Sequence, residues 1–489
     1  MTSKKTYLFI IFILLSAFFI YSLNVQNLYF NSPDEAITKL FSGIYGKTGK
    51  MYYEPNDYYF DIISRIRGTY IYENKIVPLK FIGYPYLFGS TTTFVPDLLP
   101  YITPILAAIL ILVIFLMSNE IFDDIRIAYF SAAILIFLPF FWYWANHPFF
   151  DNVSSLFFFF MGYFYLIKIS KGNHNINYFV LVGIFYGLSF AIRYDSGIIM
   201  LATSLPFIFE LRKIKIGKML TSLFFFFIVL SPILIIRSEI YGGYFMYGQR
   251  ILSSSEETIP RFFDNVVQNY IWVGVFFQLI ILAIVGMFIE IKGTNNLNKK
   301  IVLGIIIFIV LFSYIYLSEF APKHPNALHE SFTRYSLGFY IFASIFIGRL
   351  FTIWHSKTAL LMFLVFLVLS FSVAFPIIDW QWKSAEKNEN LVKKIQENTQ
   401  ENSYILVAGE DKYLYPSRKA IPINNYKDNE SGEINYSRLS QDLWEINKRF
   451  PVYIYAQYLD LDKISQETSK IGLKIIPENK TIYLYEVRR

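Results

Sequence analysis

Eleven long apolar runs constrain this sequence more than any other feature. Most have about 17 to 20 residues, the length that an α-helix needs to cross the hydrocarbon core of a bilayer. With 55% hydrophobic and 20% aromatic residues, the 489-residue composition also fits a chain that lies largely in lipid. We therefore predict a polytopic α-helical membrane protein. Its predicted spans are residues 7–23, 97–118, 127–145, 152–168, 176–191, 196–209, 219–236, 271–289, 301–317, 336–352 and 358–377.

The distribution of basic residues predicts the orientation. They collect in alternate loops, and cytoplasmic loops are the ones that carry such an excess. We place the N-terminus in the cytoplasm and keep the run 7–23 as a span, because residues 24–30 offer no signal-peptide cleavage site. Eleven crossings then put the C-terminus and the long loops 24–96 and 237–270 outside the cytoplasm of a plasma-membrane protein. The basic residues on the inner side are Lys168, Lys171, Arg212, Lys213, Lys215, Lys218, Lys292, Lys299, Lys300 and Lys357.

The soluble parts of the chain form two predicted regions. The first is the outer loop 24–96, which we assign to a membrane domain of residues 1–378. It should contain two amphipathic helices that could lie flat on the membrane, one after Pro33 and one ending at Gly68. The second is a C-terminal extracytoplasmic α/β domain of residues 379–489. Its expected strands are 404–409 and 451–457, followed by a hairpin of 473–478 with 481–487, and its expected helix is 439–450.

The segment 31–36, NSPDEA, is the first candidate for an active site. Ser32, Pro33 and Glu35 have the spacing of a helix N-terminus with a capping box, which gives Glu35 a structural role. This interpretation leaves Asp34 only a weak role as a charge favoured by the helix dipole. The position of Asp34 favours a functional role, because a carboxylate at the outer end of many spans can contact a lipid-borne substrate.

Polar residues at the outer ends of other spans are the remaining candidates. Asp151 follows His147 in a tight turn between aromatic-rich spans, where it is either a helix cap or a functional carboxylate. Arg193 and Asp195 lie between two short spans, where they form either a turn ion pair or an anion site sunk into the protein. Arg334 precedes a late span.

Composition excludes several other functions. The absence of cysteine excludes disulfides, thiolate nucleophiles and Cys-ligated metals. The formal charge of +7 comes from loop lysines, and the sequence has no basic stripe or motif that binds nucleic acid. His324, His329 and Glu330 lie close together in one loop, but their spacing matches no standard metal signature. We therefore predict no metal site.

Taken in order, these features resemble the GT-C glycosyltransferases. The resemblance covers the whole membrane region and favours the branch of protein mannosyltransferases and aminoarabinose transferases that uses polyprenyl phosphate sugars. Two departures are the RYD sequence at 193–195, where many relatives have lysine, and the absence of the WWDYG motif of oligosaccharyltransferases. The matches are Asp34 and Glu35 for the first acidic motif, Asp151 for the second, Arg193 for the basic hairpin, and Arg334 with Tyr335 for the late Arg-Tyr pair.

The resemblance implies an inverting transferase that moves a sugar from a polyprenyl (dolichyl or undecaprenyl) phosphate to a hydroxyl acceptor on protein, lipid or glycan. Asp34 would be the base, with Glu35 and Asp151 as the other catalytic carboxylates. Arg193, Arg334 and Lys80 would bind the donor phosphate, and Tyr335 and His147 would contact other parts of the substrates. We expect no required cofactor, although a divalent cation could replace the cationic clamp.

Two other functions remain as alternatives. A transporter or flippase of lipid-linked sugars should show matched halves and broken spans with charges near the midplane, and the sequence shows no such repeat. A noncatalytic assembly subunit differs from an enzyme only in activity. The sequence therefore favours the transferase.

Overall fold

The structure, a computed structural model, divides into two compact units. The first comprises Met1–Val25 and Phe81–Asp379, and the second comprises Gln26–Lys80 and Trp380–Arg489. The predicted boundary near residue 379 agrees with this division. The outer-loop residues 26–80, however, group with the C-terminal domain and not with the membrane helices. Residues described are 4–23, 25, 32–55, 58–79, 81–208, 214–243, 274–316, 334–354, 356–414, 418–428 and 432–489.

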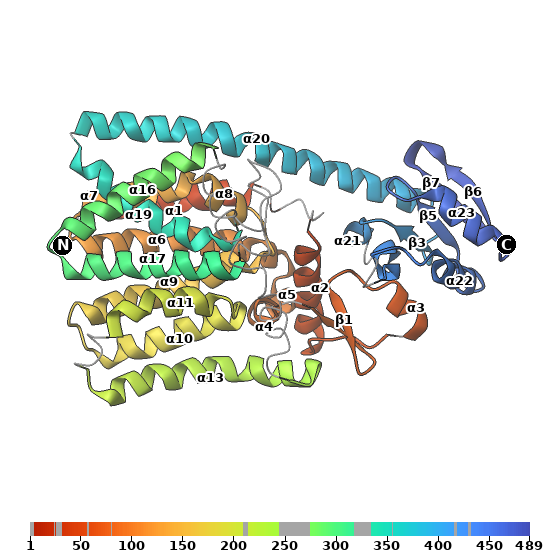
Figure 1. Cartoon of the computed structure of the whole chain (residues 1–489), viewed down its shortest axis with the longest axis horizontal. Coiled ribbons are helices and arrows are strands. Elements are labelled where there is room, and N and C mark those ends of the chain that lie inside the picture. The colour runs from red at the N-terminus through yellow and green to blue at the C-terminus, as the bar shows by residue number, and fades with distance from the viewer. Residues whose placement is uncertain are drawn as a thin grey trace. The chain divides into compact units, whose positions relative to one another are not determined.

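Long helices that run side by side make up the first unit (Figure 1). Every predicted span coincides with one of them, or with a pair of consecutive helices. Shorter elements at one end of the unit are α4 (Gly83–Phe88), α5 (Thr91–Phe94) and the 3-10 helix Pro96–Tyr101. The long helices and their short extensions are α1 (Lys4–Ser22), α6 (Ile102–Phe122), α7 (Ile125–Phe137), α8 (Pro139–Ala145), α9 (Asp151–Ser170), α10 (Ile176–Ile192), α11 (Ser196–Ser204), the 3-10 helix Leu205–Phe207, α13 (Ile216–Tyr241), α16 (Gly274–Lys292), α17 (Asn296–Tyr316), α19 (Leu337–Ile353) and α20 (Ser356–Glu397), whose residues from Trp380 onward belong to the second unit.

These helices confirm an integral membrane protein. Within the described residues, four helices are long and apolar enough to cross a bilayer, and a fifth span results if α7 and α8 count as one. Four further apolar helices are shorter. The predicted span 127–145 is bent by 60° between α7 and α8, because Pro139 removes a helical N–H and pushes the preceding residue out of the helical region.

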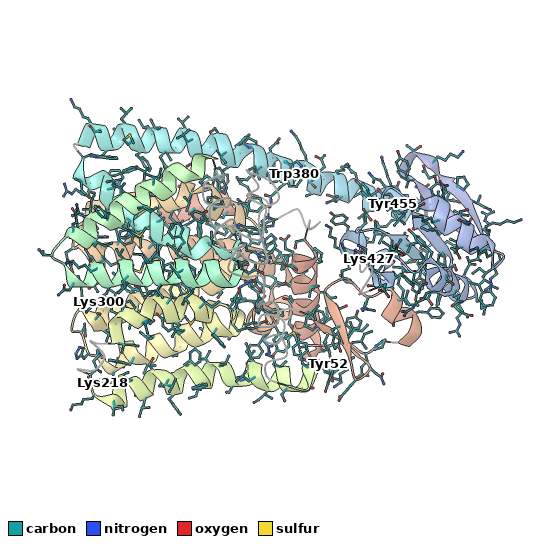
Figure 2. All side chains as sticks on the ribbon, in the orientation of Figure 1. Tyr52, Lys218, Lys300, Trp380, Lys427 and Tyr455 are labelled. Atoms are coloured by element: carbon teal, nitrogen blue, oxygen red, sulfur yellow. The ribbon has the colours of Figure 1, made fainter. Side chains whose placement is uncertain are left out.

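Small residues let the helices approach closely. A Cβ atom added to Gly183 of α10 would lie 2.2 Å from the carbonyl oxygen of Ser222 in α13, so only glycine fits there. Basic residues mark one end of this unit, where Figure 2 shows Lys218 and Lys300 together. This arrangement fits the predicted cytoplasmic side, although the orientation itself stays a prediction.

A mixed five-stranded sheet forms the centre of the second unit. Its strand order is β4-β3-β5-β7-β6, with β3 parallel to both β4 and β5, and β7 antiparallel to β5 and β6. The predicted strands, helix and closing hairpin are confirmed, whereas the short strand β4 was not predicted. The elements are β3 (Tyr404–Val407), α21 (Asp411–Leu414), β4 (Lys419–Pro422), the 3-10 helix Ile423–Tyr426, α22 (Tyr436–Asn447), β5 (Val452–Tyr455), α23 (Leu461–Ser469), β6 (Lys474–Asn479), the 3-10 helix Lys480–Ile482 and β7 (Leu484–Arg488).

The outer-loop residues of the second unit pack onto this domain. They form α2 (Pro33–Thr48), α3 (Tyr58–Ile63) and the hairpin of β1 (Thr69–Tyr72) and β2 (Lys75–Pro78). Helix α2 confirms the first predicted helix, but α3 ends at Ile63 and not at Gly68. The prediction that α3 lies flat on the membrane is wrong, since Phe60 and Ile63 are buried in a core with Tyr404.

One charge pair anchors this packing. The backbone N–H and Nε of Arg67 donate to the two carboxylate oxygens of Asp411 at 3.1 and 2.9 Å, and Nη2 donates to the carbonyl oxygen of Gly409 at 2.8 Å. The Asp411 side chain is 0% exposed. Burial raises the pKa of Asp411, and the charge and N–H groups of Arg67 oppose that rise.

Replacing Arg67 should therefore destabilise the second unit. We expect Arg67→Ala to cost roughly 3 kcal/mol near neutral pH, because it leaves a buried carboxylate without its partner. The loss should shrink as the pH falls, since the pKa of Asp411 rises further without Arg67 and a protonated carboxyl no longer needs a cation. Thermal unfolding and amide exchange of residues 58–79 in the full-length protein measure both effects.

Lys419→Ala is the matched control. It removes the more exposed Lys419–Asp61 ion pair of the same unit, at 3.2 Å with 45% of the lysine side chain exposed. Exposed pairs contribute little to stability. Equal losses for the two variants would contradict the anchoring role of Arg67.

Candidate active site

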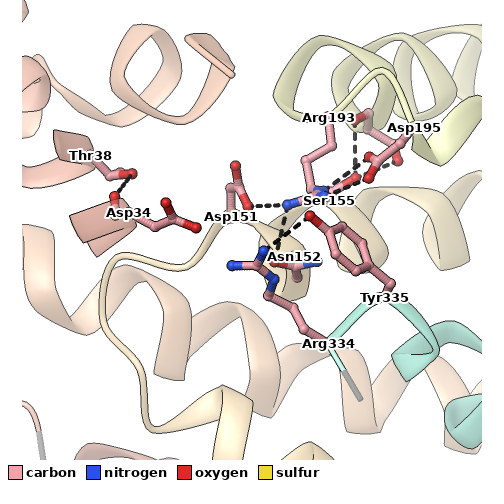
Figure 3. A network of polar contacts seen from close by, with 10 residues as sticks. Asp34, Thr38, Asp151, Asn152, Ser155, Arg193, Asp195, Arg334 and Tyr335 are labelled. Carbon is pink, nitrogen blue, oxygen red and sulfur yellow. Dashed lines mark hydrogen bonds and ion pairs between the residues drawn. The ribbon is translucent and has the colours of Figure 1, made fainter. Parts of the chain in front are cut away.

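The turn between α10 and α11 places a buried arginine at the centre of a polar cluster. Arg193 ends α10, and its guanidinium donates to both carboxylate oxygens of Asp195, from Nε at 3.0 Å and from Nη2. Its Nη1 donates to Asp151 at 2.6 Å and to Asn152 at 3.1 Å (Figure 3). These bonds occupy four of the five guanidinium N–H donors, and the side chain is only 4% exposed.

Both structural features expected of Arg193, a turn ion pair and a position sunk into the protein, are present together. The ion pair with Asp195 is present, as the structural interpretation predicts, and the turn is also sunk into the protein. Arg193 carries cation–π contacts as well, with the rings of Phe81 at 4.5 Å and Tyr335 at 5.3 Å. Two carboxylates and two rings therefore fix the position of one cation.

Asp151 reaches this cluster because its turn is held on several sides. It is the first residue of α9, and Phe150 is the N-cap, so Asp151 does not cap the helix. The hydroxyl groups of Tyr84 and Thr103 both donate to the carbonyl oxygen of Pro148, at 3.2 and 2.9 Å. Because the turn is held there, the Asp151 carboxylate, which is buried, can face Arg193.

The segment that begins at Phe81 covers the same turn. A Cβ atom added to Gly83 would lie 2.0 Å from the carbonyl oxygen of Ala191, so α4 can approach the end of α10 only with glycine at this position. Phe81 packs edge-on against Tyr194 at 4.6 Å. Lys80, which we predicted to bind phosphate, lies outside the described residues.

A second buried arginine lies beside the first. Arg334, three residues before the start of α19, is 8% exposed, and its Nη2 donates to the hydroxyl of Tyr335 at 3.0 Å. Its guanidinium also lies over the rings of Phe150 and Trp144. A small cavity of about 40 Å³ connects the two arginines, since Arg193, Asp195, Arg334, Tyr335, Asn152 and Ser155 all line it.

Acidic and basic side chains meet in this cluster. The two arginines carry two positive charges, and Asp151 and Asp195 carry two negative charges. This buried cluster is stable around Arg193 because both carboxylates pair with that guanidinium and accept its hydrogen bonds. It also holds two cations beside a cavity, where they could interact with an anion.

His147 lies in an aromatic cluster that includes two of the rings beneath Arg334. Its ring packs against Tyr143 at 4.8 Å, Phe150 at 5.1 Å and Trp144 at 5.4 Å. These contacts position the turn before Asp151. The predicted role of His147 in substrate binding stays a prediction.

Asp34 and Glu35 belong to the second unit. Ser32 caps α2 as predicted, but its hydroxyl accepts from the N–H of Asp34 at 3.2 Å, where a capping box would use Glu35. The carbonyl oxygen of Asp34 accepts from Thr38 at 2.9 Å (Figure 3), and its side chain is half-buried in the first turn. The N-terminal end of the helix dipole favours a negative charge there.

Glu35 has a different environment from its neighbour. Glu35 is 1% exposed, and its negative charge favours the protonated form of Lys412. Burial and Arg67 lower the pKa of Lys412, and the carboxylates of Asp411, Glu410 and Glu35 oppose this shift. These facts favour a structural role for Glu35.

Sequence reasoning missed two members of the cluster and misplaced a nearby arginine. Asn152 and Ser155 follow Asp151 on α9, and the hydroxyl of Ser155 donates to the carbonyl oxygen of Ser189 at 3.1 Å, which ties α9 to α10. Arg237, predicted in an outer loop, lies on α13, buried, with its guanidinium over the rings of Tyr194 and Tyr241. Its Nε has no hydrogen-bond partner within the described part of the chain. Spacing along α9 could have found Asn152 and Ser155, whereas Arg237 was noted only as one of the arginines of an outer loop.

Comparisons with known proteins bear on this architecture. Residues 87–236 match the sequence model of the dolichyl-phosphate-mannose-protein mannosyltransferase family. A search of curated proteins finds no significant match. Among solved structures, ArnT from Cupriavidus metallidurans bound to undecaprenyl phosphate matches with a TM-score of 0.60 and 10% identity, over 98% of this chain and 97% of that chain. The apo state of ArnT from the same organism matches with a TM-score of 0.61 and 9% identity, over 99% and 98%.

The similarity to ArnT extends over nearly the full length of both chains, so it includes the C-terminal domain as well as the membrane helices. The family match falls on the part of the chain that carries Asp151 and Arg193. The chain therefore has the fold of the GT-C glycosyltransferases, and its expected resemblance to their mannosyltransferase and aminoarabinose transferase branch is confirmed.

Proposed function

We propose that the protein is an inverting glycosyltransferase that moves a sugar from a polyprenyl phosphate to a hydroxyl acceptor at the outer face of the membrane. The observation that carries this proposal is the pair of buried guanidinium groups, Arg193 and Arg334, beside one cavity in a membrane-embedded unit. The GT-C fold and the family match support it. So does the undecaprenyl phosphate bound to ArnT, a protein of the same fold.

The donor chemistry explains why two arginines are useful. A phosphodiester-linked sugar carries one negative charge on phosphate, and the departing lipid phosphate carries two. Cations beside the phosphate therefore stabilise the transition state more than the ground state. We assign Arg334 and the edge of Arg193 to this role, with Asp151 and Asp195 as positioning residues that hold the Arg193 guanidinium in place.

A single base completes the mechanism. The lipid phosphate is a good leaving group without protonation, unlike the leaving group of a glycosidase, which needs a second carboxyl as acid. We assign the base to Asp34, which takes the proton of the acceptor hydroxyl as the oxygen attacks the anomeric carbon. The C–O bond to phosphate breaks on the opposite face, so the configuration inverts. In this proposal the acceptor hydroxyl belongs to a protein, lipid or glycan, and the transfer requires no metal.

Arg334→Ala should weaken binding of the donor. Losing a charge-assisted hydrogen bond to phosphate costs roughly 1.5 to 3 kcal/mol, which corresponds to an affinity about ten- to a hundredfold lower. Binding of undecaprenyl phosphate to the purified protein measures this directly. Arg349→Ala is the matched control, since Arg349 pairs with Glu290 at 2.9 Å near the other end of α19. Similar affinities for Arg334→Ala and the wild type would exclude the assigned role.

Asp34→Asn should abolish the base while keeping the shape of the helix start. We expect the single-turnover release of free lipid phosphate to fall by a factor of about a hundred or more, with donor binding preserved. Glu35→Gln, in contrast, should keep most of the turnover. If Asp34→Asn reacts at a near-normal rate, Asp34 is not the base, and a slow but well-folded Glu35→Gln would give Glu35 a direct role.

A further inference from the structure

The C-terminal sheet has a topological switch point. Strand β3 continues through α21 to β4 on one side, whereas β5 continues through α23 toward β6 and β7 on the other side. β3 and β5 are parallel neighbours, so both end at the same edge of the sheet. The connection after β3 turns to one side and the connection after β5 turns to the other. In open α/β sheets, ligands bind in the crevice outside the carboxyl ends of strands at such a point.

A large cleft lies at this edge. It has a volume of about 710 Å³, within the usual range of about 300 to 1,000 Å³ for small-molecule sites. One wall is the outer part of α20, where Lys383, Lys387 and Lys394 have the spacing of a single helix face. The opposite wall follows β3 and β5 and includes Glu410, Tyr413, Tyr455, Gln457, Tyr458 and Tyr483. Figure 2 shows Tyr455 beside the outer part of α20.

Tyr483 has an unusual backbone conformation at this cleft. Its φ is +56°, in the left-handed region that favours glycine, and its side chain is 52% exposed. The conformation is held by its neighbours, since its N–H donates to Lys480 and its carbonyl oxygen accepts from Ala456 at 2.9 Å. Strain of this kind in a non-glycine residue is frequent at binding sites.

A second tyrosine is presented in a similar way. Tyr458 is 67% exposed and follows β5. A chain of hydrogen bonds orients it, because Tyr455 donates to the side-chain oxygen of Gln457, whose amide nitrogen donates to the Tyr458 hydroxyl at 3.1 Å. The cleft therefore presents two exposed aromatic rings, and neither ring is required for the buried core.

We propose that this cleft binds a glycan. Exposed tyrosine rings can pack against the apolar face of a sugar, and they offer rigid contact area at low entropic cost. The surrounding amides, carboxylates and lysines supply both donors and acceptors for hydroxyl groups. Three lysines and two glutamates nearly balance in charge, which favours a hydroxyl-rich ligand over a strongly charged one. Resting on the proposed function, the bound glycan would be an acceptor or part of it.

Titration of the full-length protein in lipid nanodiscs tests this proposal. The probes are soluble oligosaccharides of mannose, glucose and N-acetylglucosamine, without any donor. We expect the wild type to bind at least one of them, and Tyr458→Ala and Tyr483→Gly to weaken that binding about tenfold, as expected for the loss of one aromatic contact. Tyr70→Ala, which removes a tyrosine that is 44% exposed on β1 of the same unit, should bind like the wild type.

The glycine variant separates binding from folding. Glycine adopts a positive φ without strain, so Tyr483→Gly should keep or raise the melting temperature while it loses affinity. Retained affinity in both cleft variants, or a wild type that binds no oligosaccharide, would overturn the proposal. The titration needs no donor, so glycan binding without sugar transfer would refute only the proposed function. Sugar transfer without cleft binding would refute only this inference.

Discussion

The charge of Arg193 is the constraint on which the first unit depends. A guanidinium that is 4% exposed in a membrane-embedded bundle is stable only if carboxylates surround it. Asp151 from the start of α9 and Asp195 from the start of α11 meet this need, and Asn152 adds a neutral acceptor. Three helix termini are thereby drawn together, and Arg334 is placed beside the same cavity.

This arrangement makes the polar site rigid, as the proposed function requires. The carboxylates orient Arg193, and aromatic rings support both guanidinium groups. Under the proposed function, the cations would be in place before the lipid phosphate binds, so little reorganisation would be needed when charge develops on the leaving group. Under this account Asp151 acts through Arg193 as a positioning residue, which differs from the catalytic role that the sequence suggested.

Local patterns predicted much of the fold. Apolar runs of the right length gave the helices, and Ser32 with Pro33 gave the start of α2, because both signals depend on neighbouring residues. The packing of residues 26–80 on the C-terminal domain could not be predicted in this way. It depends on contacts such as that between Arg67 and Asp411, which are 344 residues apart in sequence. The two acidic partners of Arg193 were visible as candidates, but only the fold shows that one guanidinium contacts both of them.

A transferase of the proposed kind must cleave the bond between a sugar and a polyprenyl phosphate. The most direct measurement incubates the purified protein with a panel of polyprenyl phosphate sugars and a mixture of hydroxyl acceptors, and detects free lipid phosphate. The account predicts that at least one donor releases its lipid phosphate and that the transferred sugar has inverted anomeric configuration. Donors that all stay intact, or that only change leaflet in reconstituted vesicles, would contradict a transferase and favour a flippase.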